Sequence, residues 1–468
     1  MEFFIKERKV GLSKYLLKVT VGVVACVCAG ALLMVSCNDS DEEAKKYDPA
    51  KATVLKDFYP AEGKFKEKVM LTGTNLPTDP EKVRVYFNQR RAPVIGGTVE
   101  RMYVMAPRLP GDDCVISVVI DGGDSLVYSN IFKYEESITV TTIAGNGDQV
   151  GFQEGPLASA ILQPRYICCD NQGNVFITNW RHDDNRDNCY ICRLNEEENV
   201  FTRLSTTRGE TNIPCADPET GVVSVAIEAT LGAFITANPD EYWAPRQREI
   251  KFLNGRPHES QGWKHCMVVN PTDGYLYTRW YHGHIVRINQ TTYEAYIITR
   301  IEQGDSYGLT FRPGEPNILY ISFWGNAGPF ARSIVTLDVS AGRDLEATDP
   351  DAAKAAVQAT IQRVSSPSTG GGHRDGPLAM AQFGQIGQIY CDQDGFIYVA
   401  DYDNHCIRRI TPENQVETVL GIPGTRGWKD GTRDEALFYN PRGIAIAPDG
   451  SVYVADAGNS RLRKLSVN

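Results

Sequence analysis

Short runs in which apolar and polar residues alternate make up most of the chain beyond residue 50. Residues 83–87 (Val-Arg-Val-Tyr-Phe) are a clear example, and turn-forming residues separate one run from the next. A period of two places successive side chains on opposite faces of a strand, so this pattern predicts β-strands. Residues 51–136, where the runs follow one another closely, are predicted to form an all-β sandwich.

An internal repeat of about 55 residues occupies the C-terminal part of the chain. Residues 395–401 (Gly-Phe-Ile-Tyr-Val-Ala-Asp) recur as residues 450–456 (Gly-Ser-Val-Tyr-Val-Ala-Asp), and the same frame begins near residue 151. Residues 138–468 have room for six such repeats. A fixed period of this size is typical of solenoids and propellers, and six strand-rich repeats predict a six-bladed β-propeller.

The ends of the repeat region are complementary. Residues 139–145 match residues 416–421, the outer strand that ends a repeat, whereas the last repeat stops without such a strand. The segment near residue 140 is therefore predicted to pair with the last repeat. This pairing would close the ring and remove two exposed sheet edges.

Two families resemble these segments. Residues 51–136 resemble an IPT/TIG domain in the strand and Gly-x-Asn turn of residues 69–76 and in the closing strand 129–134. The repeats resemble NHL repeats in the Pro-Arg-Gly-Ile strand of residues 441–444 and in the Tyr-Val-Ala-Asp strand that follows it. The resemblance implies an all-β chain: an immunoglobulin-like IPT/TIG sandwich, then a six-bladed NHL-type β-propeller over residues 137–468.

The first 36 residues are predicted to be a signal peptide. A basic stretch ends at Lys18, an apolar run follows, and residues 33–37 are Leu-Met-Val-Ser-Cys. This ending resembles the cleavage box of bacterial lipoproteins, which implies that Cys37 becomes the lipidated first residue of the mature protein. An uncleaved membrane anchor and a secretory signal with an incidental Cys37 are the alternatives.

Residues 37–50 are predicted to be a flexible tether, because they lack an apolar pattern. Residues 38–43 (Asn-Asp-Ser-Asp-Glu-Glu) resemble the surface-export signal of lipoproteins from glycan-degrading Gram-negative gut bacteria. The resemblance implies a protein that is lipid-anchored in the outer membrane and faces the cell exterior. A plain solvated tether is the alternative.

The formal net charge is −10 at pH 7, and it becomes about −13 once the basic signal peptide is removed. An acidic protein binds nucleic acid poorly, because that affinity comes largely from neutralising phosphates. We therefore expect no nucleic-acid partner. Of the twelve cysteines, nine follow Cys37, and an odd number cannot form a complete set of disulfides.

Aromatic residues are concentrated four positions after the central aromatic of the repeated strand. Aligning the repeats at Phe176, Phe234, Tyr277, Tyr320, Tyr398 and Tyr453 gives Trp180, Asn238, Tyr281, Trp324, Tyr402 and Ala457. The strand runs into a loop at this position, so the rings should gather on one face, where they suit the apolar faces of sugar rings. We predict a ligand site at Trp180, Trp243, Arg279, Trp280, Tyr281, His282, Trp324 and Tyr402. Packing between blades is the alternative role of these aromatics.

Chemical motifs are few. His282 and His284 would lie on one face of a strand and could be two metal ligands, but no complete ligand set is visible, so we assign no metal. Asp401 and Asp456 are expected to be structural, capping turns through backbone N–H groups. The sequence contains no phosphate loop, nucleophile elbow or HExxH motif. We assign no catalytic residue and no cofactor.

These features favour a non-enzymatic cell-surface lipoprotein that binds a glycan, or a partner in an outer-membrane transporter complex, through one face of its propeller. The architecture resembles that of proteins found with Sus-like polysaccharide-utilisation systems. Two alternatives stay open. One is a lyase or hydrolase acting at the central channel, since some NHL-like propellers are zinc-dependent lyases. The other is a structural subunit that docks onto an outer-membrane complex.

Overall fold

The computed structural model describes residues 46–467 apart from 109–110, 112, 136–137, 148–150, 181–187, 229–231, 258–261, 302–303 and 369. The predicted signal peptide and Cys37 lie outside the described residues. The described chain is built from strands, with a single α-helix, α1 (Pro350–Ala359). No helix among these residues is long and apolar enough to span a membrane. All nine cysteines among them are free thiols.

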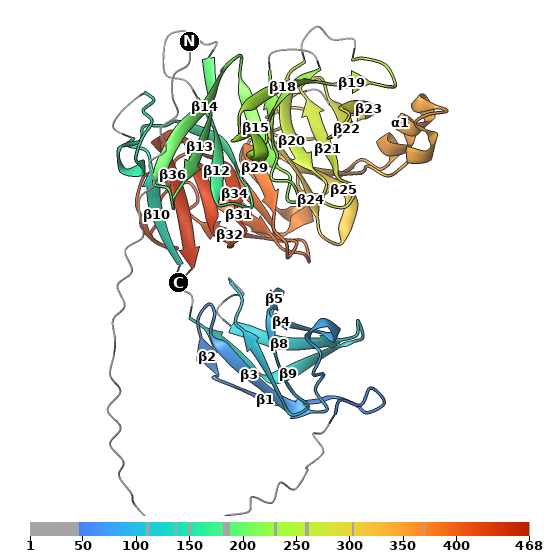
Figure 1. Ribbon diagram of the computed structural model, residues 1–468, viewed down its shortest axis with the longest axis vertical. Helices are drawn as coiled ribbons and strands as arrows, with labels where there is room; N and C mark the ends of the chain where they lie inside the picture. Colours follow the sequence, from blue (N-terminus) through green and yellow to red (C-terminus); the bar gives the residue numbers. More distant parts are fainter. Residues whose placement is uncertain are drawn as a thin grey trace, which may run out of the picture. The chain divides into compact units, whose positions relative to one another are not determined.

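The N-terminal strands form two sheets that share one core (Figure 1). One sheet holds β1 (Val54–Tyr59), β3 (Lys68–Thr74), β7 (Arg101–Met105) and β6 (Val94–Thr98), and the other holds β2 (Glu62–Gly63), β9 (Ser125–Tyr134), β8 (Asp113–Ile120), β4 (Val83–Phe87) and β5 (Arg90–Ala92). Burial alternates residue by residue along β3, because only one face of its sheet meets the core. The predicted immunoglobulin-like sandwich is confirmed.

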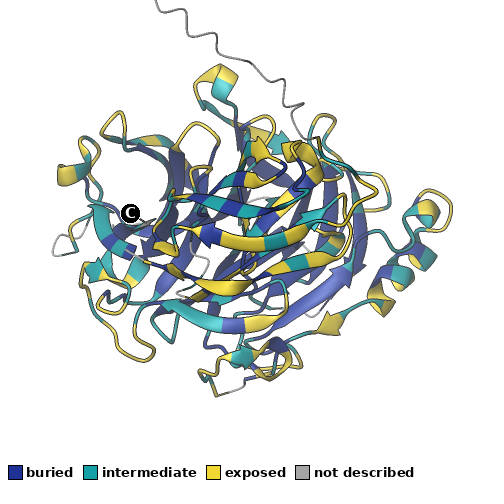
Figure 2. Ribbon diagram, turned by 90° about the horizontal axis from the view of Figure 1, so that it is seen from below, coloured by how far each residue is buried: buried dark blue, intermediate teal, exposed yellow. Residues whose placement is uncertain are grey.

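Six further sheets of four or five strands form the six-bladed propeller, which is also confirmed. Blade 1 is β11 (Pro164–Cys169), β12 (Asn174–Asn179), β13 (Asn188–Asn195) and β14 (Val200–Arg208); blade 2 is β15 (Thr211–Ala216), β16 (Val223–Ile227), β17 (Ala233–Ala237) and β18 (Pro245–Glu249); blade 3 is β20 (Lys264–Val269), β21 (Tyr275–Trp280), β22 (His284–Asn289) and β23 (Glu294–Arg300), with β19 (Lys251–Phe252) at its edge. The strands are largely buried and the loops between them largely exposed (Figure 2).

The remaining blades follow the same plan. Blade 4 is β24 (Gly308–Arg312), β25 (Glu315–Ser322), β26 (Ile334–Asp338) and β27 (Gln362–Arg363); blade 5 is β29 (Ile386–Cys391), β30 (Ile397–Asp401), β31 (Cys406–Ile410) and β32 (Gln415–Leu420), with β28 (Gly376–Pro377); blade 6 is β34 (Pro441–Ile446), β35 (Val452–Asp456), β36 (Arg461–Val467) and β10 (Ile138–Ala144), with β33 (Gly431–Thr432). In every blade the first strand named is the inner one.

The ring closes as the sequence predicts. Strand β10 pairs antiparallel with β36, the last strand of the chain, from Ile138 opposite Val467 to Ala144 opposite Leu462 (Figure 1). The six inner strands contact one another in the order β11, β15, β20, β24, β29 and β34, and β34 contacts β11 again. The beginnings of all six inner strands therefore meet around one axis.

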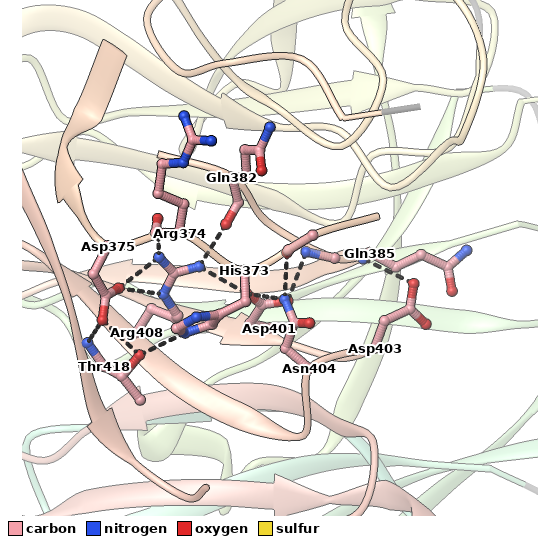
Figure 3. Close-up of polar contacts among 12 residues, drawn as sticks. His373, Arg374, Asp375, Gln382, Gln385, Asp401, Asp403, Asn404, Arg408 and Thr418 are labelled. Atoms are coloured by element: carbon pink, nitrogen blue, oxygen red, sulfur yellow. Dashed lines mark hydrogen bonds and ion pairs between the residues drawn. The ribbon is translucent and has the colours of Figure 1, made fainter. Parts of the chain in front are cut away.

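Asp401 and its partners form a buried polar network in blade 5 (Figure 3). Asp401 Oδ1 accepts from the Gly384 backbone N–H at 2.9 Å, and Oδ2 accepts from Asn404 Nδ2 and Arg408 Nη1. Asp375 binds the other side of the Arg408 guanidinium. Burial raises the pKa of Asp401, and the Arg408 charge opposes this effect only in part. The resulting pKa is about 6. These contacts hold strands together, as expected for a structural aspartate.

The N-terminal sandwich contacts the propeller through Arg90 on β5. Its guanidinium lies 2.5 Å from an Asp392 carboxylate oxygen and 3.0 Å from one of Asp394, and it also donates to the Tyr398 hydroxyl. Asp392 and Asp394 lie in the loop between β29 and β30. The ring of Phe396 stacks on the same guanidinium, with its centroid 3.7 Å away.

Candidate functional site

Strand pairing defines equivalent positions in the six blades. Phe176, Ser224, Tyr277, Tyr320, Tyr398 and Tyr453 on the second strands lie opposite Cys168, Cys215, Val268, Thr310, Tyr390 and Ala445 on the inner strands. The position in blade 2 is thus Ser224. Phe234 lies on β17, the third strand of that blade, so the alignment predicted from the sequence is wrong there.

One end of the propeller carries the predicted aromatic residues. Four positions beyond the paired residues, at the end of each second strand, stand Trp180, Glu228, Tyr281, Trp324, Tyr402 and Ala457. Glu228 takes the place that the sequence alignment gave to Asn238. Trp180 is 46% exposed, and Tyr281, Trp324 and Tyr402 are partly exposed. These four rings therefore belong to one face, as side chains that follow equivalent strands.

The inner strands begin at that same face, because they run antiparallel to the second strands. Three positions before the paired residues stand Arg165, Asn212, His265, Tyr307, Gly387 and Arg442. Since the inner strands form a closed ring, these six residues surround the propeller axis at the end that carries the aromatic rings. All except Gly387 have polar side chains.

Seven of these and neighbouring side chains form what we call the aromatic–arginine cluster: Arg165, Tyr166, Trp180, Tyr307, Trp324, Tyr402 and Arg442. The ring centroids of Trp324 and Tyr402 are 4.7 Å apart, and Tyr307 meets Trp324 edge to face at 5.5 Å. With the Gln385 amide oriented to satisfy both its neighbours, Trp324 Nε1 donates to the Gln385 oxygen at 2.8 Å. The cluster thus joins blades 1, 4, 5 and 6.

Two arginines lie among these rings. The Arg442 guanidinium carbon is 4.8 Å from the Trp324 ring centroid and 5.4 Å from that of Trp180, and Nε donates to the Tyr166 hydroxyl at 3.0 Å. The Arg165 guanidinium carbon is 4.6 Å from the Trp180 ring centroid, and Nη1 forms an ion pair with Glu210 at 2.6 Å. Cation–π contacts of this kind stabilise a cation by about 0.5–2 kcal/mol each.

Two carboxylates and one imidazole lie on the opposite side of the axis, on blades 2 and 3. His265 Nδ1 accepts from the Ser306 backbone N–H at 3.4 Å, so the neutral ring carries its proton on Nε2. Nε2 lies 3.8 Å from Glu228 and 3.9 Å from Asp305. Burial, followed by the charges of nearby arginines, lowers the pKa of His265, and burial raises the pKa of Glu228. His265 is therefore neutral at pH 7.

The axis beneath the cluster is filled by side chains. The Tyr166 ring, fully buried, stacks on Tyr307 from across the ring at 5.5 Å between centroids. One step deeper, Gln388 of β29 exchanges two hydrogen bonds with the Ile167 backbone of β11. Both rings are buried, so side chains close this end of the axis.

Other residues of the predicted ligand site lie elsewhere. Trp280 is 1% exposed and packs edge to face on Phe252. Trp243 packs at 6.2 Å on Phe176, in the core cluster between blades 1 and 2. Arg279 is fully buried and donates to the Gly304 carbonyl at 2.8 Å. The packing alternative therefore describes Trp280 and Trp243, whose rings bury against neighbouring apolar side chains.

The His282-Gly283-His284 segment does not form the strand that we assumed. Strand β21 ends at Trp280 and β22 begins at His284, so His282 lies in the turn between them. The two imidazoles thus do not alternate along one strand. His284 packs against the Trp280 ring, and His282 against Tyr281. Among the described residues, no group of three or more His, Cys, Asp or Glu side chains could hold a metal ion.

A cavity of about 890 Å³ lies at the other ends of the inner strands. Its lining includes Cys169 and Cys391, the last residues of β11 and β29, together with Arg90 and Arg108 of the N-terminal sandwich. Arg90, in the wall of this cavity, already pairs with Asp392 and Asp394. We therefore place the candidate site at the aromatic–arginine cluster, where rings are exposed.

The fold and this cluster define a β-propeller protein preceded by an immunoglobulin-like domain. Residues 54–134 match the IPT/TIG domain model, and residues 438–465 match the NHL repeat model.

Among curated relatives, Protein SUPPRESSOR OF QUENCHING 1, chloroplastic, of Arabidopsis thaliana is 36% identical over 80 residues, 17% of this chain and 8% of that protein. Teneurin-3 of Mus musculus is 32% identical over 94 residues, 17% of this chain and 4% of that protein. The chain spans less than a tenth of the length of either.

Solved structures from Bacteroides share the fold over most of the chain. A structural genomics protein of unknown function from Bacteroides thetaiotaomicron VPI-5482 has a TM-score of 0.70 and 24% identity, covering 91% of this chain and 100% of that one. An auxiliary nutrient binding protein from the same strain has a TM-score of 0.57 and 19% identity, covering 90% and 99%. One from Bacteroides ovatus ATCC 8483 has a TM-score of 0.56 and 19% identity, covering 91% and 100%.

The ligand site predicted from the sequence did not include the residues at the beginnings of the inner strands, among them Arg165, His265, Tyr307 and Arg442. A signal was present for two of them. Pro-Arg occurs at residues 164–165 and again at 441–442, and a charged residue at the start of two inner strands indicates a polar end to the propeller axis.

Proposed function

We propose that the protein is a lipid-anchored protein of the cell envelope that binds a glycan at the aromatic–arginine cluster. The observation that carries the proposal is the gathering of Trp180, Trp324 and Tyr402, partly exposed, around buried polar side chains at one end of the axis. Sugar rings present apolar C–H faces edged by hydroxyl groups. Aromatic rings with hydrogen-bonding groups at their base match both features.

Both hydrogen-bond donors and hydrogen-bond acceptors are available to the hydroxyl groups of a sugar. Arg442 and Arg165 supply N–H donors, and Glu228 and Asp305 supply carboxylate acceptors on the opposite side of the axis. Sites for small ligands commonly combine apolar and aromatic walls with a few placed polar groups. The filled axis supports binding at the surface of the cluster, and it does not favour passage through the propeller.

Envelope attachment rests on the lipoprotein-like segment before Cys37 and on the tether that follows it. The shared fold with auxiliary nutrient binding proteins from Bacteroides supports a nutrient-binding role in the same kind of cell. A partner in an outer-membrane transporter complex would fit the same location. We propose that the protein faces the cell exterior, where polysaccharides are met.

Replacing Trp180 by alanine is expected to weaken glycan binding by about 10- to 30-fold, because truncating a central aromatic contact commonly removes about 1.5–2 kcal/mol. The melting temperature should fall by only a few degrees, since the ring is 46% exposed and its loss removes the cation–π contacts with Arg165 and Arg442. Affinity gel electrophoresis against a polysaccharide panel measures the first quantity and thermal unfolding the second. Trp324→Ala is a poorer probe, because Trp324 also packs on Tyr402 and bonds to Gln385.

Trp428→Ala is the matched control. Trp428 is also exposed, at 51%, but it stacks on Arg461 and donates to Thr142 on the outer strand β10. Its loss should leave binding unchanged. Equal losses in both variants would contradict the assignment of the site. If the wild-type protein is retained by no member of the panel, the docking-subunit alternative gains over glycan binding.

Replacing Cys37 by alanine is expected to move the protein from the membrane fraction to the soluble fraction, because the mature chain would lose its lipid. Fractionation of cells followed by detection of the protein measures this. A signal-peptide change outside the cleavage box, such as Lys14→Arg, should leave the distribution unaltered. A Cys37→Ala protein that stays in the membrane fraction would rule out the lipid anchor.

The second candidate is a lyase or hydrolase, and the Glu228–His265–Asp305 group is the observation that favours it. A neutral imidazole between two carboxylates is a plausible proton carrier, although His265 is only 1% exposed. Release of oligosaccharide products from the bound polysaccharide, lost in His265→Ala, would establish this function in place of simple binding.

A further inference from the structure

Among the described residues, no anionic side chain pairs with the charge of Arg442. The side chain is 92% buried, among the rings of Tyr166, Trp180, Tyr307 and Trp324. Its Nε donates to the Tyr166 hydroxyl. Among the residues that the structure describes, no carboxylate lies within 4.0 Å of its guanidinium.

Arginines in comparable positions do have carboxylate partners. Arg165 occupies the same register position in the neighbouring blade, and Glu210 pairs with it at 2.6 Å. Arg408 and Arg463, both fully buried, each pair with two aspartates. Arg442 departs from this pattern at the end of the axis where the aromatic rings are exposed.

A buried charge is costly unless it is paired and hydrogen-bonded. The four rings around Arg442 offset part of this cost, because their faces attract a cation. They cannot accept the hydrogen bonds of its two Nη groups. A carboxylate or sulfate accepts such a pair of bonds in parallel, and this charge-assisted geometry is among the strongest hydrogen-bonding arrangements.

We propose that the ligand is an acidic glycan, whose sugar ring stacks on the exposed aromatics while its carboxylate or sulfate pairs with Arg442. This inference rests on the proposed function and specifies its ligand. The arrangement also sets an orientation. Glu228 and Asp305 repel an anion from blades 2 and 3, so the anionic substituent should face blades 1 and 6, with sugar hydroxyls toward Glu228 and Asp305.

Titration calorimetry with pairs of probes that differ in charge tests the proposal on the mature chain. Polygalacturonate and hyaluronan are each compared with their methyl esters, and dextran sulfate with dextran, beside neutral galactan and starch. At least one charged probe should bind, and its uncharged counterpart should bind about 10- to 100-fold more weakly, the equivalent of one charged hydrogen-bonded contact. The pair that shows the difference distinguishes a carboxylate ligand from a sulfate ligand.

Variants assign the difference to Arg442. Arg442→Gln should bind both members of a pair equally weakly, whereas Arg442→Lys, which keeps the charge without the planar fork, should recover part of the preference. Trp180→Ala should weaken both members by the same factor. If Arg442→Gln does not fold, the comparison of charged and uncharged probes on the wild-type chain still decides the matter.

Three outcomes count against the inference in different ways. Uncharged probes that bind as tightly as charged ones would overturn the acidic ligand and leave glycan binding standing. Failure of every probe to bind, charged or neutral, would overturn both proposals. Charge preference that survives in Arg442→Gln would also overturn the inference, because another cation would then bind the anion.

Discussion

Replacing Asp401 by alanine is expected to lower the free energy of unfolding by about 3–5 kcal/mol, because it breaks a buried ion pair on one side only. Asp401 and Arg408 are both fully buried, 3.1 Å apart. The substitution also leaves the Gly384 N–H without its acceptor and removes one of the two acceptors of the Asn404 amide, which keeps the Gly372 carbonyl (Figure 3). Asp375 still pairs with Arg408 at 2.6 Å, so the lower part of this range is expected.

Urea unfolding of the two proteins measures the loss, and Glu413→Ala is the control. Glu413 is an exposed carboxylate in the turn between β31 and β32 of the same blade, so its loss should change stability by no more than about 0.5 kcal/mol. Asp456, which pairs with Arg463 and accepts from the Tyr439 N–H, should behave like Asp401. A loss below about 1 kcal/mol at both aspartates would show that the network does not stabilise the blades.

The number of blades could be predicted because the last two repeats have the same residues at the same spacing. The Tyr-Val-Ala-Asp strand ends in a buried aspartate at Asp401 and Asp456, and both aspartates make the same contacts. A fixed contact needs a fixed residue at a fixed spacing. The pairing of β10 with β36 was predictable for the same reason, since a missing strand at one end matched an extra strand at the other.

Blade 2 shows where such alignment fails. Its second strand, β16, has Ser224 at the position that other blades fill with an aromatic ring. Its third strand, β17, contains Phe234 and is equally buried along its length. The hydrophobic pattern cannot distinguish two fully buried strands, so the aromatic residue drew the alignment to the wrong one. Strand pairing replaces Asn238 with Glu228 and brings a carboxylate to the site.

The cluster itself was only half predictable. Aromatics at the ends of the second strands follow a recognisable strand, and Trp180, Trp324 and Tyr402 were found in this way. The beginnings of the inner strands differ from blade to blade, as Arg165, His265 and Arg442 illustrate. The repeated Pro-Arg of residues 164–165 and 441–442 marks two of them, but nothing in the repeat marks His265 or Tyr307, because closure of the ring brings these residues together and their side chains need not match.

Replacing Lys264 by methionine is expected to stabilise the protein, with an effect that grows as the pH falls. Lys264 begins β20 beside His265; its side chain is fully buried, with its ammonium 5.1 Å from the Trp280 ring centroid. Burial lowers the pKa of Lys264 to about 7, against the smaller opposing effect of Glu228. The unfolded chain, with an ordinary lysine pKa, therefore binds more protons than the folded protein between about pH 7 and 10.5.

The sign follows from this difference in bound protons. The contribution of Lys264 to the free energy of unfolding rises with pH between about pH 7 and 10.5. It is lowest below pH 7, where the buried ammonium is charged. Each pKa unit corresponds to about 1.4 kcal/mol, so the wild-type protein should gain about 2–3 kcal/mol from this group between pH 6 and pH 9. Methionine does not titrate. The difference in free energy of unfolding between variant and wild type, measured with urea, should therefore shrink by about 2–3 kcal/mol from pH 6 to pH 9.

Other titrating groups cancel in this difference, because both proteins contain them. If the difference in free energy of unfolding stays constant with pH, a charged Lys264 does not destabilise the folded protein. If Lys264→Met is more stable at pH 6 and binds the ligand less well, the buried ammonium is retained for the site, beside Glu228 and His265. Buried charges that reduce stability are found where function requires them, and this result would place Lys264 in the same functional group as Arg442.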